Sequence, residues 1–371
     1  MRIVHIIDLL IFGGAQKLLV YFAKEARYRG IEMEVISLRP NWSYSPFVEQ
    51  LRELGVNVTT LNIRRLYDFR AIPTLLRILR HGKFDIVQTH LTHANVLGVS
   101  AARLAGLPVI ATLHTTNESD LAGLFKARRM LQRFTLRRLA SRVLAVGDVV
   151  AAAHQGRLRG RKIDVIPNAV MDPPELGVDE RLTLRRTVLG NPVRFFVLAV
   201  GRMITDKGFD DLIDAFELVV KQNPSAYLLI AGDGELFEDL QRQIQQKGLS
   251  ENVGLPGSRD DVPQLMAAAD IYVSSSRREG LSIAMLEAMS AGLPIVATTV
   301  GEAPMVLAEG RGVLVAPRQI QELAQALNNV IENADLRKGC GSAARAYVRK
   351  NYNLSLWMDR LLDLYRQEIR S

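Results

Sequence analysis

Short apolar runs alternate with amphipathic stretches along almost the whole chain. Seven runs rich in β-branched and other apolar residues fall in the first half, and six more fall in the second. This alternation is typical of βαβ units built around a parallel sheet. The pattern predicts strands at residues 2–8, 33–38, 58–63, 84–90, 109–114, 142–147, 164–168, 194–201, 226–232, 252–257, 270–276, 294–299 and 312–317.

The length of 371 residues favours two such domains, because single hydrophobic cores stop growing at roughly 250–300 residues. Residues 171–180, MDPPELGVDE, carry paired prolines and few apolar residues, as linkers do. We therefore expect an α/β protein with Rossmann-like domains over 1–171 and 191–352 and a linker over 172–190. If the domains face each other, the carboxyl ends of both sheets border one cleft, where ligands bind in doubly wound folds.

The last segment, residues 353–371, has the pattern of an amphipathic helix. A helix of this kind docks on the rest of the protein through its apolar stripe. The residues of that stripe are Leu354, Trp357, Leu361, Leu364 and Tyr365.

The amino terminus, MRIVHIIDLLIFGGA, superficially resembles a signal peptide. His5 and Asp8 interrupt the apolar run, so we expect it to form the first strand. No charge-free run approaches the roughly 18 apolar residues that span a bilayer. The single cysteine, Cys340, excludes an intramolecular disulfide and fits a reducing compartment. We expect a cytoplasmic protein, or one that is peripheral on the inner face of a membrane.

Basic residues are concentrated in the first half of the chain. Residues 1–171 contain 25 Lys plus Arg and 12 Asp plus Glu, a net charge of +13, whereas the remainder contains 22 and 27, a net charge of −5. Residues 126–142 hold seven basic residues and no acidic one. Such a segment suits an anionic surface, although any solvated surface helix is amphipathic too. The basic residues expected at a membrane are Lys126, Arg128, Arg129, Arg133, Arg137 and Arg138.

Two glycine-containing turns that follow predicted strands suit an anion. After the first strand, Gly13 and Gly14 allow close approach of a ligand to the backbone, and the next helix presents free N–H groups. Tight turns often carry Gly-Gly without binding anything. In GRMITDKG, residues 201–208, Arg202 and Lys207 could converge on a diphosphate. The alternative is that both are ordinary surface side chains, but the adjacent glycines favour diphosphate binding.

A third turn, AGDGE at residues 231–235, follows the next strand. Gly232 and Gly234 permit a tight turn against a flat group such as a nucleobase. Asp233 and Glu235 also suit a simpler task, which is to cap the helix that follows. Capping is the preferred interpretation of these two carboxylates.

The segment EGLSIAMLEAMSAG, residues 279–292, places two glutamates in apolar surroundings. Ser282 is a good N-cap, which puts Glu279 in a loop and Glu287 on a buried helix. A carboxylate there could accept hydrogen bonds from the two hydroxyls of a ribose. The amides of Gly280, Leu281 and Ser282 would face anions or sugar hydroxyls. A buried ion pair between Glu287 and a distant arginine is the structural alternative.

The histidines give a weaker signal. His114 ends a predicted strand, where a histidine is more often structural than catalytic. His90 and His93 have the spacing of two metal ligands, but no third ligand is evident nearby, so we expect no metal site. The chain also lacks any Asp-x-Asp pair.

Together, the Gly-Gly turn, the GR and DKG elements and two glutamates with seven residues between them resemble the retaining GT-B glycosyltransferases of the family 4 type. That family includes bacterial exopolysaccharide, lipopolysaccharide and mannolipid transferases. The resemblance covers nearly the whole chain, and the glutamate pair with GR and DKG in order is fairly specific. It implies two Rossmann-like domains facing a cleft and a final helix that crosses back to the first domain.

The resemblance also implies a role for each matching residue. Arg202 and Lys207 would bind the pyrophosphate and stabilise the leaving nucleoside diphosphate. Glu279, helped by the three amides after it, would bind the donor sugar, and Glu287 the ribose. His114 would lie near the donor sugar. The remaining donor-site residues would be Gly13, Gly14, Gly201, Asp233, Gly234, Gly280, Leu281 and Ser282.

By the same resemblance, the reaction moves a hexose-type sugar from a nucleoside diphosphate, UDP in preference to GDP, to a saccharide or lipid-linked acceptor, with retention and without a metal or other cofactor. The alternatives are a nucleotide-sugar epimerase or hydrolase and a non-catalytic sugar-nucleotide binding protein. A Rossmann dehydrogenase is excluded because no Gly-x-Gly-x-x-Gly turn is present. Nucleic acid is not expected, since the basic segment lacks interleaved aromatic residues.

Overall fold

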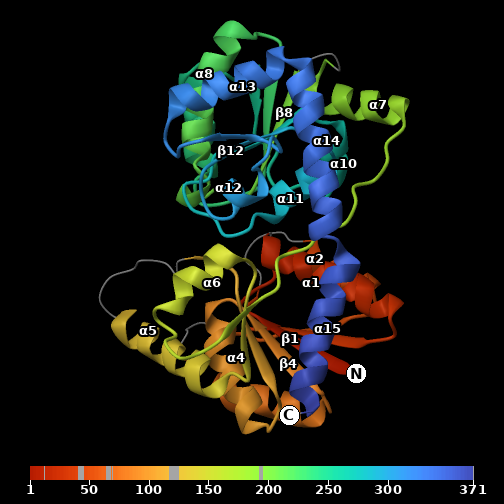
Figure 1. The fold of residues 1–371 in the computed structure, drawn as a ribbon, viewed down its shortest axis with the longest axis vertical. Helices are drawn as coiled ribbons and strands as arrows, with labels where there is room; N and C mark the ends of the chain where they lie inside the picture. The colour runs from red at the N-terminus through yellow and green to blue at the C-terminus, as the bar shows by residue number, and fades with distance from the viewer. Residues whose placement is uncertain are drawn as a thin grey trace. The chain divides into compact units, whose positions relative to one another are not determined.

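The computed structural model describes residues 1–11, 13–40, 46–63, 68, 70–116, 125–191 and 195–370, the side chains of 125–128 excepted. The chain divides into two compact units, drawn in Figure 1. Unit 1 comprises Met1–Asn168 with Leu354–Ser371, and unit 2 comprises Ala169–Asn353.

Unit 1 is built on a parallel sheet with the strand order β3-β2-β1-β4-β5-β6-β7. The order reverses between β1 and β4, and ligands bind at such points, outside the carboxyl ends of the strands. The strands are β1 (Arg2–Ile7), β2 (Glu32–Ser37), β3 (Asn57–Thr60), β4 (Ile86–His90), β5 (Val109–Leu113), β6 (Arg142–Ala145) and β7 (Ile163–Val165). The helices are α1 (Gly14–Tyr28), α2 (Phe47–Glu53), α3 (Ala71–His81), α4 (Thr92–Leu104), α5 (Phe125–Phe134), the π-helical turn η1 (Thr135–Leu139), α6 (Asp148–Gln155) and the final α15 (Leu354–Arg370).

Unit 2 repeats the design with the strand order β10-β9-β8-β11-β12-β13, again all parallel. Here the order reverses between β8 and β11. The strands are β8 (Phe195–Val200), β9 (Ala226–Ala231), β10 (Val253–Gly254), β11 (Ile271–Ser274), β12 (Ile295–Thr298) and β13 (Val313–Val315). The helices are α7 (Val178–Leu189), the short 3-10 helix η2 (Thr205–Lys207), α8 (Phe209–Gln222), α9 (Phe237–Gln246), α10 (Val262–Ala268), α11 (Ile283–Ser290), α12 (Ala303–Val306), α13 (Ile320–Glu332) and α14 (Ala334–Asn351).

Each strand of the described residues falls at a strand that the apolar runs predict, so the doubly wound α/β fold class is confirmed. The amino terminus is a strand, as its interrupted apolar run indicates. The central strands of both sheets are buried, which is why they are mostly apolar, whereas the edge strand β3 (NVTT) is partly exposed.

The final helix, α15, packs on unit 1 as the resemblance implies, although it follows unit 2 in sequence. Its Trp357 ring meets Phe22 of α1 edge to face, with ring centres 6.1 Å apart. The buried Tyr365 hydroxyl donates to the Gln88 side chain on β4. Toward its end, Arg142 donates to Glu368 at 2.6 Å. The apolar stripe and these polar contacts together attach α15 to the face of the sheet that carries Gln88.

The linker predicted over 172–190 differs from the structure. Its second half is helix α7, which belongs to unit 2. This helix has few apolar residues, so its sequence resembles a linker. It is attached by Arg185, which is buried and donates to the Ala268 carbonyl at 2.8 Å and to Asp270 at 2.9 Å. A buried arginine with such partners gives a helix a tertiary anchor that apolar periodicity does not reveal.

Candidate active site

The loops after β8 and β11 meet at the point of unit 2 where the strand order reverses. Lys207, in the β8 loop, forms an ion pair with Glu279, in the β11 loop, although 72 residues separate them. About a fifth of each side chain stays exposed, 20% for Lys207 and 22% for Glu279. A cation and a carboxylate therefore stand together where a doubly wound fold binds its ligand.

A second contact, made by an arginine, also holds this region together. Arg277 donates to Asp211 at 2.8 Å and to Asp210 at 2.7 Å, both in the first turn of α8. These two carboxylates raise the pKa of the Arg277 guanidinium above its usual range. Ser275 donates from its hydroxyl to the Lys207 carbonyl at 2.9 Å. The backbone that carries Lys207 is thus fixed against the backbone that carries Glu279.

Glycines allow the surrounding loops to approach closely. A Cβ on Gly208, which has a φ of +60°, would lie 2.4 Å from the Ser275 carbonyl oxygen. A Cβ on Gly301, with a φ of +55°, would lie 2.2 Å from the carbonyl oxygen of Gly280. Side chains at these positions would force the loops apart, so glycine is needed to assemble the site.

Helix α11 begins as its sequence predicts. The Ser282 hydroxyl accepts a hydrogen bond from the Met285 amide, which leaves Glu279 in the loop and places Glu287 on the helix with 7% exposure. Tyr272 of β11 is buried nearby, and the pKa of its hydroxyl is raised by burial and then by the charges of Glu279 and Glu287. Both glutamates therefore act on the same buried hydroxyl, which places them in one region of unit 2.

Arg202 and Asp233 stand at the same edge of the sheet and are exposed. The two loops that carry them are joined at the backbone, since the Met203 amide donates to the Asp233 carbonyl at 2.9 Å. The prediction that Asp233 or Glu235 caps the next helix is wrong, because α9 has no side-chain cap. Asp233 instead accepts a hydrogen bond from the amide of Gly234 at 2.7 Å, which shapes the turn.

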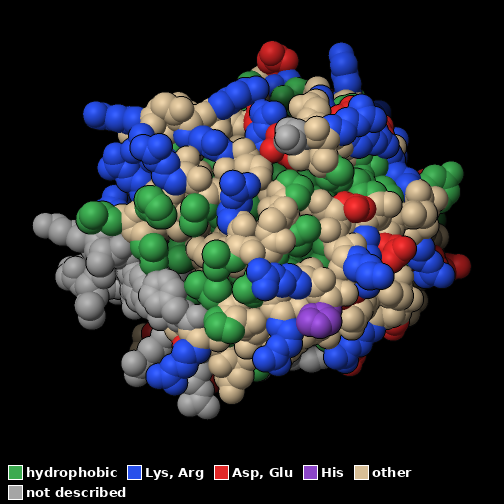
Figure 2. Space-filling view, turned by 90° about the horizontal axis from the view of Figure 1, so that it is seen from below, with side chains coloured by type: hydrophobic (Ala, Val, Ile, Leu, Met, Phe, Trp, Pro, Cys, Tyr) green, Lys and Arg blue, Asp and Glu red, His purple; other side chains and the backbone are tan. Residues whose placement is uncertain are grey.

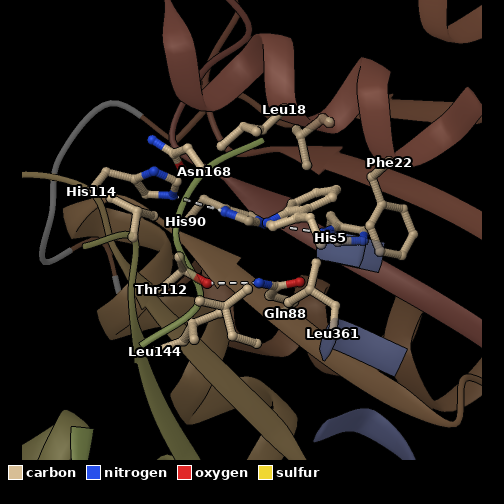
Figure 3. A pocket seen from close by; sticks show the side chains of 14 residues that line it. His5, Leu18, Phe22, Gln88, His90, Thr112, His114, Leu144, Asn168 and Leu361 are labelled. Atoms are coloured by element: carbon tan, nitrogen blue, oxygen red, sulfur yellow. Dashed lines mark hydrogen bonds between the residues drawn. The ribbon is translucent and has the colours of Figure 1, made fainter. Parts of the chain in front are cut away.

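In unit 1, three histidines from adjacent strands form a row, shown in Figure 3. His5 Nδ1 lies 3.0 Å from His90 Nε2, and His90 Nδ1 lies 3.0 Å from His114 Nε2. His5 and His90 are buried, and His114 is partly exposed. Burial lowers the pKa of His5 to about 3 and that of His114 to about 4. Burial, and then the charges of His114 and His5, lower the pKa of His90 well below its ordinary value. All three rings are neutral near pH 7.

His90 and His93 point to different partners, so the two do not form a pair of ligands. His93 contacts Asp8 at 2.8 Å, and the second oxygen of that carboxylate accepts from the Ala94 amide at 2.7 Å. Within the described part of the chain, no group of three or more His, Cys, Asp or Glu side chains is arranged to hold a metal. Gly13 lies at the start of α1 and Gly14 is its first residue, as predicted.

Comparisons with known proteins identify the family. Residues 12–171 match the model of Glycosyltransferase Family 4, and residues 182–347 match that of Glycosyl transferases group 1. The chain belongs to the group 1 family of glycosyltransferases. Its fold matches the crystal structure of HepE from Anabaena in complex with UDP-glucose, with a TM-score of 0.86 and 24% identity over 99% of this chain and 100% of that one.

Two curated relatives of this glycosyltransferase illustrate the range of the family. The UDP-Gal:alpha-D-GlcNAc-diphosphoundecaprenol alpha-1,3-galactosyltransferase of Escherichia coli is 29% identical over 331 residues, 85% of this chain and 84% of that protein. The GDP-mannose-dependent monoacylated alpha-(1-6)-phosphatidylinositol monomannoside mannosyltransferase of Corynebacterium glutamicum is 32% identical over 178 residues, 46% of each chain.

The basic segment of this glycosyltransferase is helix α5, continued by η1. The buried side faces the core through residues such as Leu136, whereas Met130 and Phe134 are 71% and 54% exposed. With Arg133, Arg137 and Arg138 they line a groove of about 370 Å³. Arg129 is also exposed, and the side chains of Lys126 and Arg128 lie outside the described residues. Many Lys and Arg side chains surround hydrophobic ones on the face seen in Figure 2.

Sequence reasoning did not single out three residues that contact predicted ones or lie beside them within their own unit: His5, Arg277 and Tyr272. For the histidine a signal was present. His5 pairs in register with Gln88, and Gln88 is two residues before His90. Since side chains alternate along a strand, residues two apart share a face, so His5 and His90 could have been placed together once the strands were known to be neighbours.

Proposed function

We propose that this glycosyltransferase moves a hexose from a UDP-sugar, or alternatively a GDP-sugar, to a saccharide or lipid-linked saccharide acceptor with retention of configuration. It thereby acts in glycolipid or polysaccharide biosynthesis. The observation that carries the proposal is the meeting of Lys207 and Glu279 where the strand order of unit 2 reverses. That point is the ligand site of a doubly wound fold, and it holds the cation that a diphosphate needs.

In the proposed complex, the leaving nucleoside diphosphate takes the place of Glu279 as the partner of Lys207. Arg202, exposed on the same loop, supplies a second positive charge. Electrostatic stabilisation of a developing anion is usually the largest single contribution to catalysis. Because these cations can balance the diphosphate, the proposed reaction needs no divalent metal.

Once released from Lys207, Glu279 can accept hydrogen bonds from donor-sugar hydroxyls. The amides of Gly280, Leu281 and Ser282 follow it at the start of α11, where a helix presents free N–H groups. Glu287 is buried on the same helix and is proposed to hold the ribose through two accepted hydrogen bonds. Both glutamates then bind the donor, and neither acts as the general base.

The proposed chemistry is a front-face substitution. The bond between the anomeric carbon and the diphosphate oxygen breaks while the acceptor oxygen forms its bond to the same face of that carbon. The acceptor proton passes to the leaving phosphate oxygen. His114 is proposed to lie beside the donor sugar and to orient it, and Gly13 and Gly14 are proposed to approach the pyrophosphate.

The donor proposal draws on the relatives as well as on the site. The Escherichia coli relative is named for UDP-galactose and spans most of this chain, whereas the Corynebacterium glutamicum relative is named for GDP-mannose and spans less than half. The longer match favours UDP.

A membrane-associated acceptor is supported by α5 and η1. Exposed Met130 and Phe134 lie one helical turn apart, with exposed Arg133 between them. Apolar side chains flanked by arginines suit the interface of an anionic bilayer, where both kinds of group find partners. None of the described helices has both the length and the apolarity needed to cross a bilayer. We propose peripheral binding through this surface, which would bring a lipid-linked saccharide to the enzyme.

The test is transfer with a panel of UDP- and GDP-sugars, with and without saccharide and undecaprenyl-diphosphate-linked acceptors, in the presence of EDTA. We expect acceptor-dependent release of one nucleoside diphosphate and an α-linked product from an α-linked donor, read by NMR. Consumption of a donor at the same rate without any acceptor would instead show an epimerase or hydrolase. Binding of a donor with no turnover under any condition would show a non-catalytic binding protein.

A further inference from the structure

Three neighbouring strands each place one histidine on the same face of the unit 1 sheet. His5 comes from β1, His90 ends β4, and His114 follows β5, in the spatial order β1-β4-β5. Adjacent strands lie roughly 4.8 Å apart, so imidazole rings can reach from one strand to the next. Figure 3 shows the three rings joined end to end.

The two contacts in this row are both nitrogen to nitrogen, and each measures 3.0 Å. A contact of this length needs one proton between the two nitrogens, since two lone pairs repel and two N–H groups clash. A neutral imidazole carries a single N–H. Only two arrangements of the protons satisfy both contacts, one with Nδ1–H on all three rings and one with Nε2–H on all three.

We propose that His5 and His90 are positioning residues that fix the tautomer and the ring orientation of His114. If His5 and His90 carry Nδ1–H, His114 must offer Nδ1–H to the donor sugar. If they carry Nε2–H, His114 must offer a bare Nδ1 lone pair. His114 therefore meets a sugar hydroxyl with a predetermined donor or acceptor. This inference rests on the proposed role of His114 beside the donor.

The inner end of the row is held rigidly, which gives the proposal its physical basis. His5 is 1% exposed and packs edge to face on Phe22, with ring centres 4.5 Å apart. Trp357 and Leu361 of α15 line the same small cavity, about 20 Å³, which is space for about one water molecule. Beside the row, Gln88 donates to Thr112 at 2.8 Å and accepts from Tyr365. The packing on Phe22 and the contact with His90 therefore both oppose rotation of the His5 ring.

The first test reads the tautomers directly. The 371-residue protein contains six histidines. After labelling with ¹⁵N-histidine, long-range ¹H–¹⁵N correlation spectra can resolve them at pH 7.5 without any substrate. We expect His5, His90 and His114 to show one common tautomer. In His90→Phe, His114 should become a mixture of tautomers. Different tautomers within the row of the native protein, or an unchanged His114 in His90→Phe, would overturn the proposal.

The second test links the row to turnover. We expect His90→Phe to lower kcat about tenfold, in the range of substitutions that remove a partner of an active group. His90→Gln should recover part of the rate, because an amide can hydrogen-bond to His114. The control is His81→Gln, because His81 is exposed on α3 and its ring contacts the Arg77 carbonyl of the same helix. Native kcat in His90→Phe would contradict the positioning role.

Two further measurements separate this proposal from the proposed function. If His90→Phe fails to fold, His5→Phe provides the same tautomer test, because it frees His90 to reverse its bond to His114. If His114→Ala retains full transfer while the common tautomer is observed, the proposed role of His114 is wrong and the fixed tautomer stands. If transfer is lost in His114→Ala and the native rings show mixed tautomers, the proposed role of His114 stands and the fixed tautomer is wrong.

Discussion

Lys207 and Glu279 are each other's counter-ion in the free protein. Their ion pair joins the loop after β8 to the loop after β11, at the point where the strand order of unit 2 reverses. Both side chains are partly exposed, so the pair adds little stability, roughly 1 kcal/mol or less. A diphosphate can therefore replace Glu279 at low cost, and this exchange would prepare Lys207 for the leaving group and Glu279 for the sugar.

Lys207→Ala should abolish transfer while leaving the fold intact. It removes the cation closest to the proposed leaving group and leaves the negative charge of Glu279 to repel the diphosphate. We expect kcat/KM to fall at least a hundredfold, measured by diphosphate release, with an unchanged circular dichroism spectrum. The matched control is Lys247→Ala, which breaks ion pairs of similar exposure to Asp214 and Glu217. Equal activity in the two variants would refute the assignment.

Glu287→Ala should also abolish transfer, because a buried acceptor for the ribose is lost. Glu287→Gln tests the reason: the amide keeps the size but offers only one acceptor oxygen. Its donor Kd should rise about tenfold or more, corresponding to roughly 1.5–3 kcal/mol for one hydrogen bond to a charged group. Calorimetric titrations with the donor and with the free hexose distinguish a loss of ribose binding from a loss of sugar binding. Native donor affinity in Glu287→Gln would place the ribose elsewhere.

Arg277→Ala should loosen the two loops without removing a group that touches the donor. Its side chain is 15% exposed and bonds to Asp210 and Asp211. We expect a lower melting temperature and a donor KM raised several-fold, since Lys207 and Glu279 lose their common support. Arg277→Lys should restore only part of the native melting temperature and donor KM, because a lysine cannot make the two parallel hydrogen bonds of a guanidinium. Arg242→Ala, which removes an exposed ion pair to Asp239, is the control, and the idea fails if both alanine variants behave alike.

Local patterns in the sequence predict the strands because these are buried on both faces and therefore read as apolar runs. Ser282 and the loop position of Glu279 were predictable too, since an N-cap depends on neighbouring residues. Helix α7 was not predicted, because Arg185 anchors it through long-range contacts to the Ala268 carbonyl and to Asp270. Local periodicity carries no information about contacts of that kind.

The same limit applies to the site. The motif spacing places Lys207 and Glu279 at strand ends, but their direct ion pair depends on which strands are neighbours. The contact between Arg277 and Asp211 spans 66 residues, and either residue alone reads as an ordinary surface charge. The histidine row was accessible only in part, because alternation predicts a shared face and only the strand order makes His5, His90 and His114 neighbours.

The membrane proposal predicts that both charge and apolar side chains of the basic helix matter. Replacing four of its five arginines with glutamine should abolish sedimentation with vesicles that contain phosphatidylglycerol, since each basic residue contributes about 1 kcal/mol near an anionic surface. The four replaced arginines are Arg128, Arg129, Arg133 and Arg137. The double variant Met130→Ser with Phe134→Ser should also weaken vesicle binding. Added salt screens only the charges and should not reproduce this loss, because both side chains are exposed and apolar.

A charge-matched control replaces four exposed basic residues of unit 2 with glutamine: Lys221, Arg242, Lys338 and Lys350. This variant should still bind the vesicles. If the variants of the helix and of unit 2 lose binding equally, the attraction depends on net charge alone. If the helix variant keeps full binding, the membrane surface lies elsewhere.

The histidine row predicts how stability depends on pH. Because burial lowers the pKa of His5 to about 3, only the unfolded chain takes up a proton there as the pH falls below about 6.5. The free energy of unfolding therefore decreases with falling pH, by about 1.4 kcal/mol per pH unit for each such ring, until the folded pKa is reached.

Urea titrations between pH 7 and 5, above the ordinary range of carboxylates, test this dependence. A plot of the free energy of unfolding against pH should be shallower for His5→Phe than for the native protein. Parallel slopes for the native protein and His5→Phe would mean that His5 takes up its proton equally in both states, which contradicts a neutral ring at the inner end of the row.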